Sequence, residues 1–368
     1  MLLRAVFYVI LCMIAAHVLN TLYLFGYFKT VYKHYPGHCR VVPGVDLGSE
    51  DVTVTSDGLA FISSGLRGFG NKSDPLLQPP LLRGKIFLFD FNHPEKNAVE
   101  VALDGDFDRE NFYPIGISLY EDSTTGEKKL FVVNNHISNK NRVEIFRFDE
   151  RTSSLHHLKT IIGETLYSLN DLVAVGPETF YYTNFLYFTK PMPLALTLEM
   201  YSGLAWGTIG LYSEGKDMII SSGYRLPDGI NVSPDGRNLY VAIFLTGELA
   251  IFERGKDDSI TEIQRVSLHT SPDNIEVDRE TGDLWIGCIP SLHLHMAHLE
   301  NYANPGTSQV LRLRFGDQNS PFENIDVREV LMDDGSLIKG SSVASYYDNK
   351  MLVGTVVHKL AYCELSAF

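Results

Sequence analysis

The chain repeats one short pattern six times, and this repeat constrains the fold more than any other feature. In residues 47–65 an acidic pair, Glu50-Asp51, precedes an alternating apolar run, an Asp-Gly turn and a second apolar run. Alternation interrupted by Asp-Gly predicts a β-hairpin. Copies spaced roughly 45–70 residues apart, built from strands and turns, predict an all-β fold, a β-propeller with six blades. The other copies begin near Pro114, Asn170, Asp228, Asp273 and Ser341.

The polar residues that open these hairpins are candidate metal ligands. The first strand of each blade lines the central channel of a propeller, so side chains at matching positions converge. Carboxylates that close repel one another unless a cation lies between them. Oxygen ligands with several amides favour Ca²⁺ over Zn²⁺, although Asp and Asn are also common turn residues. Asn231 is included because a position two residues further along a strand keeps the same face. The candidates are Glu50, Asp51, Asn170, Asp171, Asn231, Asp273 and Asn274.

Length and charge restrict the class of protein. The 368 residues carry a formal net charge of −14, which argues against nucleic acid as a partner. Because the repeat occupies most of the chain, we expect one large domain and an anchor. The expected divisions are a cytosolic N-terminus over 1–4, a transmembrane helix over 5–28, a linker over 29–38 and the propeller over 39–368.

The apolar segment 5–28 is long enough to cross a bilayer. A cleaved signal peptide is the alternative, but the apolar region is long for one and no convincing cleavage site follows it. We therefore predict a single-pass membrane protein of the endoplasmic reticulum, the plasma membrane or both. The propeller is expected on the lumenal or extracellular side.

Four cysteines are present, and none forms a CxxC pair. Cys39 precedes the first repeat and Cys363 follows the last, so a disulfide between them would lock the closure of the ring. Such a bond implies an oxidising compartment. Cys288 ends an apolar strand and is predicted to be a buried free thiol rather than a nucleophile.

Two further motifs have possible functional meanings. The sequon that begins at Asn71 lies in a polar loop, and we expect it to be glycosylated. His293, His295 and His298 could suggest zinc, but no helix or carboxylate is predicted to frame them, so metal binding is not expected there. The chain contains no GxSxG, HExxH or P-loop motif.

Several stretches resemble the paraoxonase (serum arylesterase/lactonase) family: GSEDVTVTSDGLAFISSGL, SLNDLVAVGPETFYYTN, EMYSGLAWG, DGINVSPDG, PDNIEVDRETGDLWIGC and GSSVAS…LVGTVVHKLAYCEL. The resemblance covers nearly all of residues 39–365 and implies a six-bladed propeller with two calcium ions in its channel. It implies a disulfide between Cys39 and Cys363 and a retained N-terminal hydrophobic segment. The ligands of a catalytic calcium would be Glu50, Asn170, Asn231, Asp273 and Asn274. The ligands of a structural calcium would be Asp51, Asp171 and the carbonyl of Ile117.

The sequence departs from this family at the residues that handle protons. A histidine dyad is proposed to generate the attacking hydroxide in paraoxonases, and its positions are Ile115 and Asn135 here. His136 lies one residue further on and would face the other side of a strand. Two further family histidines near the pocket correspond to Leu186 (or Phe185) and Ile289.

Three functional hypotheses follow. The preferred one is a non-enzymatic protein with a structural calcium, resembling the nematode membrane-anchored branch that assists degenerin/epithelial sodium channels as a chaperone or accessory subunit. The second is a calcium-dependent lactonase or arylesterase with a rearranged base, Glu50 or Asp273. General-base assistance contributes about 10²–10⁴-fold, so such an enzyme would be weak. The third is a lipid-carrying or lipoprotein-associated protein.

Overall fold

The computed structural model describes residues 2–70, 74–79, 81–138, 141–188, 193–316 and 322–366. Within these ranges the strands form six sheets, each beginning with a strand from one copy of the repeat. The first strands of neighbouring sheets contact one another around a ring, β2 to β7, β7 to β11, and so on to β23, which returns to β2. The predicted six-bladed β-propeller is therefore confirmed.

The strands follow one another blade by blade along the chain, except that β1 belongs to the last blade. The first blade contains β2 Val52–Val54, β3 Leu59–Ser64, β4 Lys85–Asp90 and β5 Val99–Glu100. The second contains β6 Ala102–Asp104, β7 Pro114–Glu121, β8 Lys128–Asn134, β9 Arg142–Asp149 and β10 Ser154–Ile161. The third contains β11 Leu169–Ala174, β12 Phe180–Asn184, β13 Gly207–Ser213 and β14 Lys216–Tyr224. The fourth blade contains β15 Pro227–Val232, β16 Asn238–Ile243, β17 Glu248–Arg254 and β18 Ile260–Ser267. The fifth contains β19 Ser271–Val277, β20 Leu284–Ile289, β21 Ser308–Arg314 and β22 Asp326–Asp333. The sixth contains β23 Ser341–Tyr347, β24 Lys350–Thr355, β25 Leu360–Glu364 and β1 Cys39–Val42.

The hydrophobic core lies between neighbouring blades, because each sheet is apolar on both faces. Phe61 of the first blade meets Phe148 of the second edge to face, with ring centroids 4.9 Å apart. Trp285 of the fifth blade stacks on Tyr346 of the sixth at the same centroid distance, 4.9 Å. Packing of this kind holds each inner strand in place along the channel.

Strand β1 closes the ring by pairing antiparallel with β25, so the start of the domain completes its last blade. Cys39 lies opposite Cys363 in this register, and the two form a disulfide. The predicted disulfide is therefore confirmed. Cys288 is a free thiol and fully buried, as predicted, and burial raises its pKa.

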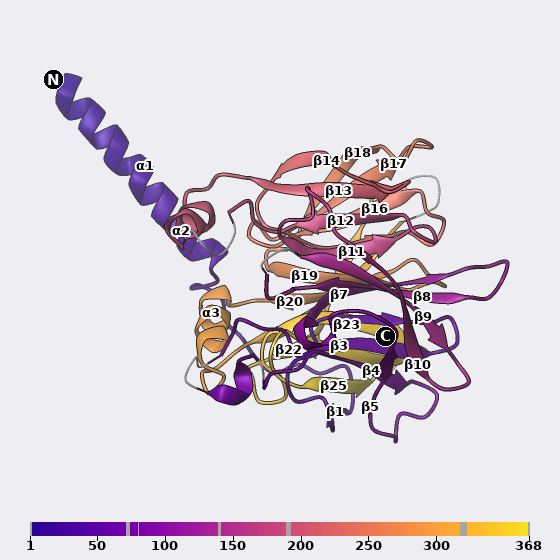
Figure 1. Cartoon of the computed structure of the whole chain (residues 1–368). Helices are drawn as coiled ribbons and strands as arrows, with labels where there is room; N and C mark the ends of the chain where they lie inside the picture. Colours follow the sequence, from indigo (N-terminus) through magenta and orange to yellow (C-terminus); the bar gives the residue numbers. More distant parts are fainter. Residues whose placement is uncertain are drawn as a thin grey trace.

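Three α-helices and two 3₁₀ helices accompany the blades in the described part of the chain. They are α1 Leu2–Leu24, α2 Pro193–Tyr201, α3 Leu292–Glu300, η1 Pro75–Leu77 and η2 Arg109–Asn111. Figure 1 shows α1 projecting from one end of the propeller, with α2 and α3 beside its base. Helix α1 is exposed almost throughout, and by length and composition it could cross a membrane.

The end of α1 differs from the prediction, which extended the helix to residue 28. The helix ends at Leu24, and the next residue, Phe25, is buried against the propeller. Gly26 has a φ of +73°, a conformation that ends helices and that residues with a side chain adopt at a cost. Its Cα lies against the backbone of Pro290 and Ser291, just before α3, so α1 is joined to the domain through a tight contact.

The segment 29–38, predicted to be a linker, runs along the fifth blade. His34 forms an isolated antiparallel bridge with Met332 of β22. The hydroxyl of Tyr32 donates to the Glu329 carboxylate at 2.7 Å, and that of Tyr35 donates to Asp333. The connection between helix and propeller is thus a packed part of the domain. The predicted glycosylation site, Asn71, lies outside the described residues.

Candidate functional site

A cavity of about 600 Å³ lies at the end of the propeller that carries α2 and α3. Its inner end is formed by four oxygen-bearing residues at the start of inner strands, which we call the oxygen floor: Glu50, Asn170, Asp228 and Asp273. Apolar side chains form most of the wall. They are Leu66, Phe69, Ile115, Leu169, Phe185, Leu186, Phe188, Leu196, Met200, Leu226, Phe244, Leu292, Met296, Leu299 and Val356.

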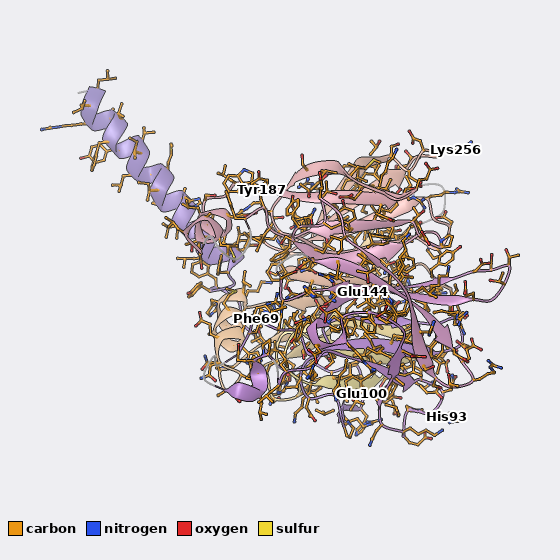
Figure 2. All side chains as sticks on the ribbon, viewed as in Figure 1. Phe69, His93, Glu100, Glu144, Tyr187 and Lys256 are labelled. Atoms are coloured by element: carbon orange, nitrogen blue, oxygen red, sulfur yellow. A yellow bond between two sulfur atoms is a disulfide. The ribbon has the colours of Figure 1, made fainter. Side chains whose placement is uncertain are left out.

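Helices α3 and α2 both contribute to the wall, through Met296 and Met200 respectively. Phe69 lies beside α3 and Tyr187 beside α2 (Figure 2). The Glu199 carboxylate of α2 is buried and accepts hydrogen bonds from the backbone N–H groups of Tyr187 at 2.8 Å and Phe188 at 3.0 Å. The helix is thereby tied to the loop that follows β12. Phe25, just after α1, stacks on Tyr201 at the end of α2 with ring centroids 5.2 Å apart.

The oxygen floor and the neighbouring Asn274 leave buried acceptors without partners. Glu50 Oε2, Asn170 Oδ1, Asp228 Oδ1 and Asn274 Oδ1 have no hydrogen-bond partner in the described structure. Asn274 directs its amide nitrogen to the Glu50 carbonyl at 3.1 Å and to Glu50 Oε1 at 3.2 Å, which leaves its oxygen free. Buried acceptors without partners cost free energy, and a hard cation is the partner that oxygen atoms of this kind take. The donor set therefore fits calcium.

The pKa values of the floor carboxyl groups indicate the same unfavourable burial of oxygen atoms. Burial raises the pKa of Glu50, Asp228 and Asp273 well above the usual range, and each is raised further by the neighbouring carboxylates. Considered alone, the described carboxylate, imidazole and thiolate side chains form no group of three or more that could hold a metal. The oxygen floor together with the neighbouring Asn274 differs from such a group because two of its oxygens are amide oxygens, those of Asn170 and Asn274.

Asp51 and Asp171, predicted to bind a second calcium, are tied to the backbone of the next blade. Asp51 accepts hydrogen bonds from the N–H groups of Val52 at 2.8 Å and Ile117 at 2.7 Å. Asp171 accepts in the same way from Leu172 at 2.7 Å and Ile230 at 2.8 Å. The contact with Ile117 runs through its amide nitrogen. The resemblance implied that its carbonyl binds the structural calcium, and that role stays a prediction. Burial raises the pKa of Asp51 to about 7, and the two backbone hydrogen bonds oppose that increase.

The structure places Asp228 in the position that the sequence assigned to Asn231. The Asn231 amide nitrogen donates to the Ile275 carbonyl at 2.8 Å, and its oxygen accepts from the Val232 N–H at 2.8 Å. Asn231 is absent from the cavity wall, and Asp228, only 2% exposed, lines it.

A register shift explains the error. In four blades the strand pairing skips the two residues before an apolar residue: Ile115-Gly116, Asn170-Asp171, Asp228-Gly229 and Asp273-Asn274. A β-bulge of this kind breaks the alternation of faces, so a two-residue spacing no longer keeps Asn231 on the side of the floor. Alignment on the following apolar residue, Leu172, Ile230 or Ile275, was the available signal.

Ile115 and Asn135, at the two positions where the resemblance implied a histidine dyad, line the cavity. Asn135 is held in place by Arg67, whose Nε donates to the Asn135 carbonyl at 2.6 Å. Leu186 and Phe185 also line the wall, whereas Ile289 is buried behind it in a cluster with Phe25 and Leu292.

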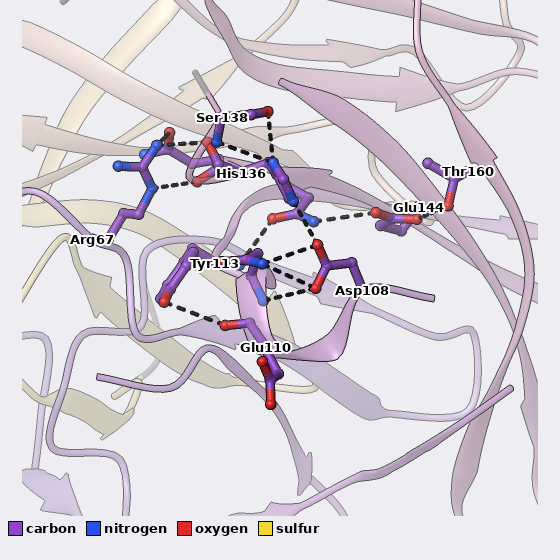
Figure 3. Close-up of polar contacts among 11 residues, drawn as sticks. Arg67, Asp108, Glu110, Tyr113, His136, Ser138, Glu144 and Thr160 are labelled. Carbon is purple, nitrogen blue, oxygen red and sulfur yellow. Dashed lines mark hydrogen bonds and ion pairs between the residues drawn. The ribbon is translucent and has the colours of Figure 1, made fainter. Parts of the chain in front are cut away.

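His136 is buried beside the cavity without lining it. Its Nε2 lies 2.8 Å from Asp108 Oδ2 and its Nδ1 lies 2.7 Å from Ser138 Oγ, as Figure 3 shows. Both ring nitrogens are therefore engaged, and His136 does not replace the missing dyad. This agrees with the expectation from the one-residue shift.

The histidines near residue 295 lie on a helix, contrary to the prediction that no helix frames them. Helix α3 carries His293, His295 and His298, and the last two are buried. His293 stacks on Tyr27 with ring centroids 4.1 Å apart, and its backbone N–H donates to the Phe25 carbonyl at 3.1 Å. The strand pattern of the preceding repeat gave no sign of this helix, which is only nine residues long.

Comparison with known proteins gives a consistent family. The model of the arylesterase family matches residues 30–365. The chain is 42% identical over 330 residues to human serum paraoxonase/arylesterase 1, and 41% identical over 328 residues to chicken serum paraoxonase/arylesterase 2; each match covers 89% of both chains. Among solved structures, a luciferin-regenerating enzyme aligns with a TM-score of 0.53 at 10% identity, over 89% of this chain and 94% of that one, which supports the fold alone. The family match and these identities show that the chain belongs to the arylesterase family.

Proposed function

We propose that this protein is a calcium-dependent hydrolase of apolar esters or lactones, the second of the three hypotheses from the sequence. The observation that carries the proposal is an open cavity of about 600 Å³ whose apolar wall ends on unpartnered oxygens. This volume lies within the range of small-molecule sites, about 300–1,000 Å³. Protein interiors otherwise pack densely, and a pocket without a ligand costs contacts.

The polar and apolar residues of the cavity would have different roles in this reaction. Glu50, Asn170, Asp228, Asp273 and Asn274 would hold the catalytic calcium, and Asp51 and Asp171 would hold a second ion. Bound calcium supplies positive charge that polarises a carbonyl group and stabilises the oxyanion that develops there. The apolar wall binds the hydrocarbon part of the substrate and excludes water from it. The proposed ligand set revises the sequence-based one by replacing Asn231 with Asp228.

We also propose that α1 anchors the protein in a membrane as a single span. The disulfide supports a propeller in an oxidising compartment, lumenal or extracellular. No feature of the described structure favours an ion-channel partner, so the chaperone hypothesis gains no support beyond the missing dyad.

The test is turnover of phenyl acetate and of an aliphatic lactone by the purified full-length chain in detergent, with calcium and with EDTA. We expect turnover that is lost in EDTA and falls by about 10²-fold or more in Glu50→Gln, which removes a charge from the floor. Glu95→Gln is the matched control, because Glu95 is exposed and remote from the cavity. Turnover that is equal in EDTA, or no turnover above buffer, would contradict the proposal.

A further inference from the structure

The cavity contains one imidazole among the described residues that line it, His295. It projects from α3, its side chain is part of the wall, and the residue is only 3% exposed. Its Nδ1 is buried without a hydrogen-bond partner. Because Nδ1 is closed to solvent on the side of Gly340, Nε2 is the ring nitrogen that a water in the cavity can reach.

The backbone makes room for this ring. A Cβ atom at Gly340 would lie 2.5 Å from His295 Nδ1, and Gly340 adopts a φ of +74°. Any side chain at position 340 would collide with the ring and strain the backbone. Glycine at this position thus lets the imidazole occupy the gap between α3 and the start of β23.

The other buried histidines of the neighbourhood are engaged or lie behind the wall. His136 is bonded on both nitrogens. His157 lies 3.0 Å from Glu144 Oε2, away from the cavity. His298 follows His295 by about one helical turn. Its Nδ1 lies 3.0 Å from the Asn304 carbonyl and its Nε2 has no partner, but the residue is absent from the wall.

The surroundings of His295 keep its ring neutral. Burial lowers the pKa of His295 to about 3, and the neighbouring His298 lowers it further. Behind these rings, His358 lies 6.0 Å from His298 between ring centroids, and Lys339 donates to the Asn304 carbonyl at 3.1 Å. A neutral imidazole has a free lone pair at every physiological pH, although low basicity limits the acceleration it can supply.

We propose, on the basis of the proposed function, that His295 accepts the proton of the attacking water and thereby takes over the task of the missing histidine dyad. One O–H bond of water breaks and its proton passes to the imidazole, while the water oxygen forms a bond to the carbonyl carbon. The carbonyl π pair moves to the carbonyl oxygen. When that pair returns, the bond to the alkoxy or aryloxy oxygen breaks, and the leaving oxygen takes the proton from the imidazolium.

The test compares His295→Gln with His298→Gln, the same change about one turn away on the same helix. We expect His295→Gln to lower kcat by about 10²-fold, the lower end of the range for general-base assistance, with KM changed little. His298→Gln should keep kcat within a few-fold. The melting temperature gained on adding calcium should be the same in both variants as in the wild type, because neither residue belongs to the oxygen floor.

Two further measurements separate catalysis from folding. His295→Ala leaves a space open to the cavity, and added imidazole should restore part of its turnover. The wild type should show a solvent deuterium isotope effect on kcat, which requires no variant to fold. Turnover lost in Glu50→Gln but kept in His295→Gln, or a missing isotope effect, would overturn the role of His295 alone. A wild type without turnover would overturn the proposed function and this inference together.

Discussion

At the scale of single residues, a β-bulge decides which side chains reach the cavity. The sequence placed Glu50, Asn170 and Asp273 at the starts of inner strands, and all three line the cavity, while their role as metal ligands stays a prediction. It placed Asn231 there through regular alternation, and the bulge between Pro227 and Ile230 sends that side chain elsewhere. Alternation is a reliable guide only where the register is regular.

The revised floor can be tested by comparing Asp228→Ala with Asn231→Ala. Calcium binding to the folded state adds RT ln(1 + [Ca²⁺]/Kd), about 2.7 kcal/mol at 100 times Kd. We expect Asp228→Ala to lose most of this gain, since it removes a ligand. Asn231→Ala should cost about 1–2 kcal/mol through lost hydrogen bonds, equally with calcium and with EDTA. Thermal unfolding of each variant, measured with calcium and with EDTA, gives the stabilisation by calcium. If only Asn231→Ala lost that stabilisation, Asn231 and not Asp228 would be the ligand.

Asp51 predicts how the metal-free protein responds to pH. Burial raises its folded-state pKa from 3.8 to about 7. The folded state then binds the proton more tightly than the unfolded state, so stability falls as pH rises from about 4 to 7. We expect a lower melting temperature in EDTA at about pH 8 than at about pH 5, a smaller difference with calcium, and a reduced dependence in Asp51→Asn. Stability in EDTA that rises over this range would contradict the placement of the buried carboxyl groups.

At the scale of elements, the helices at the cavity were the part that sequence patterns missed. Helices α2 and α3 have nine residues each, too few for a clear period between strand repeats. The end of α1 is set by a tertiary contact. Only glycine fits at position 26, because a Cβ atom there would collide with the backbone of Pro290. A pattern along the chain carries no information about such an approach.

The contact between α1 and α3 can be measured with two glycines of equal backbone conformation. Gly26 and Gly126 both have a φ of +73°, but a Cβ at Gly126 meets nothing within 4 Å. Alanine at either site costs about 1 kcal/mol of backbone strain, and Gly26→Ala also collides with Pro290. We expect limited proteolysis between residues 25 and 38 to accelerate in Gly26→Ala and to stay unchanged in Gly126→Ala. Equal cleavage in the two variants would mean that the contact is loose.

At the scale of the whole molecule, the ring and its closure were predictable because they follow from the repeat and the position of two cysteines. Six similar hairpins require six similar sheets, and the chain must bring its ends together to close them. The pairing of β1 with β25 and the disulfide Cys39–Cys363 meet that requirement. The packing of residues 29–38 on the fifth blade was not predictable, because single hydrogen bonds such as Tyr32 to Glu329 leave no pattern in sequence.

Because the disulfide helps to close the ring of blades, we expect its removal to destabilise the protein. Replacing Cys39 and Cys363 by serine should lower the free energy of unfolding by about 2–5 kcal/mol, because the unfolded chain gains freedom. Cys12→Ser is the control, since that thiol is free and exposed. Chemical denaturation with calcium present measures both. A midpoint that is the same in the double variant and the control would show that strand pairing alone closes the ring.

The packed segment between α1 and the propeller has a consequence for how ligands reach the cavity. If α1 lies in a bilayer, residues 29–38 leave the domain no free tether on which to turn, and α2 presents Leu194 (74% exposed) and Leu198 (55% exposed) at the same end. Molecules dissolved in the lipid would then reach the protein by lateral diffusion in two dimensions. The rate at which a ligand enters the cavity would then scale with its concentration in the bilayer, which is the product of its partition coefficient and its concentration in water.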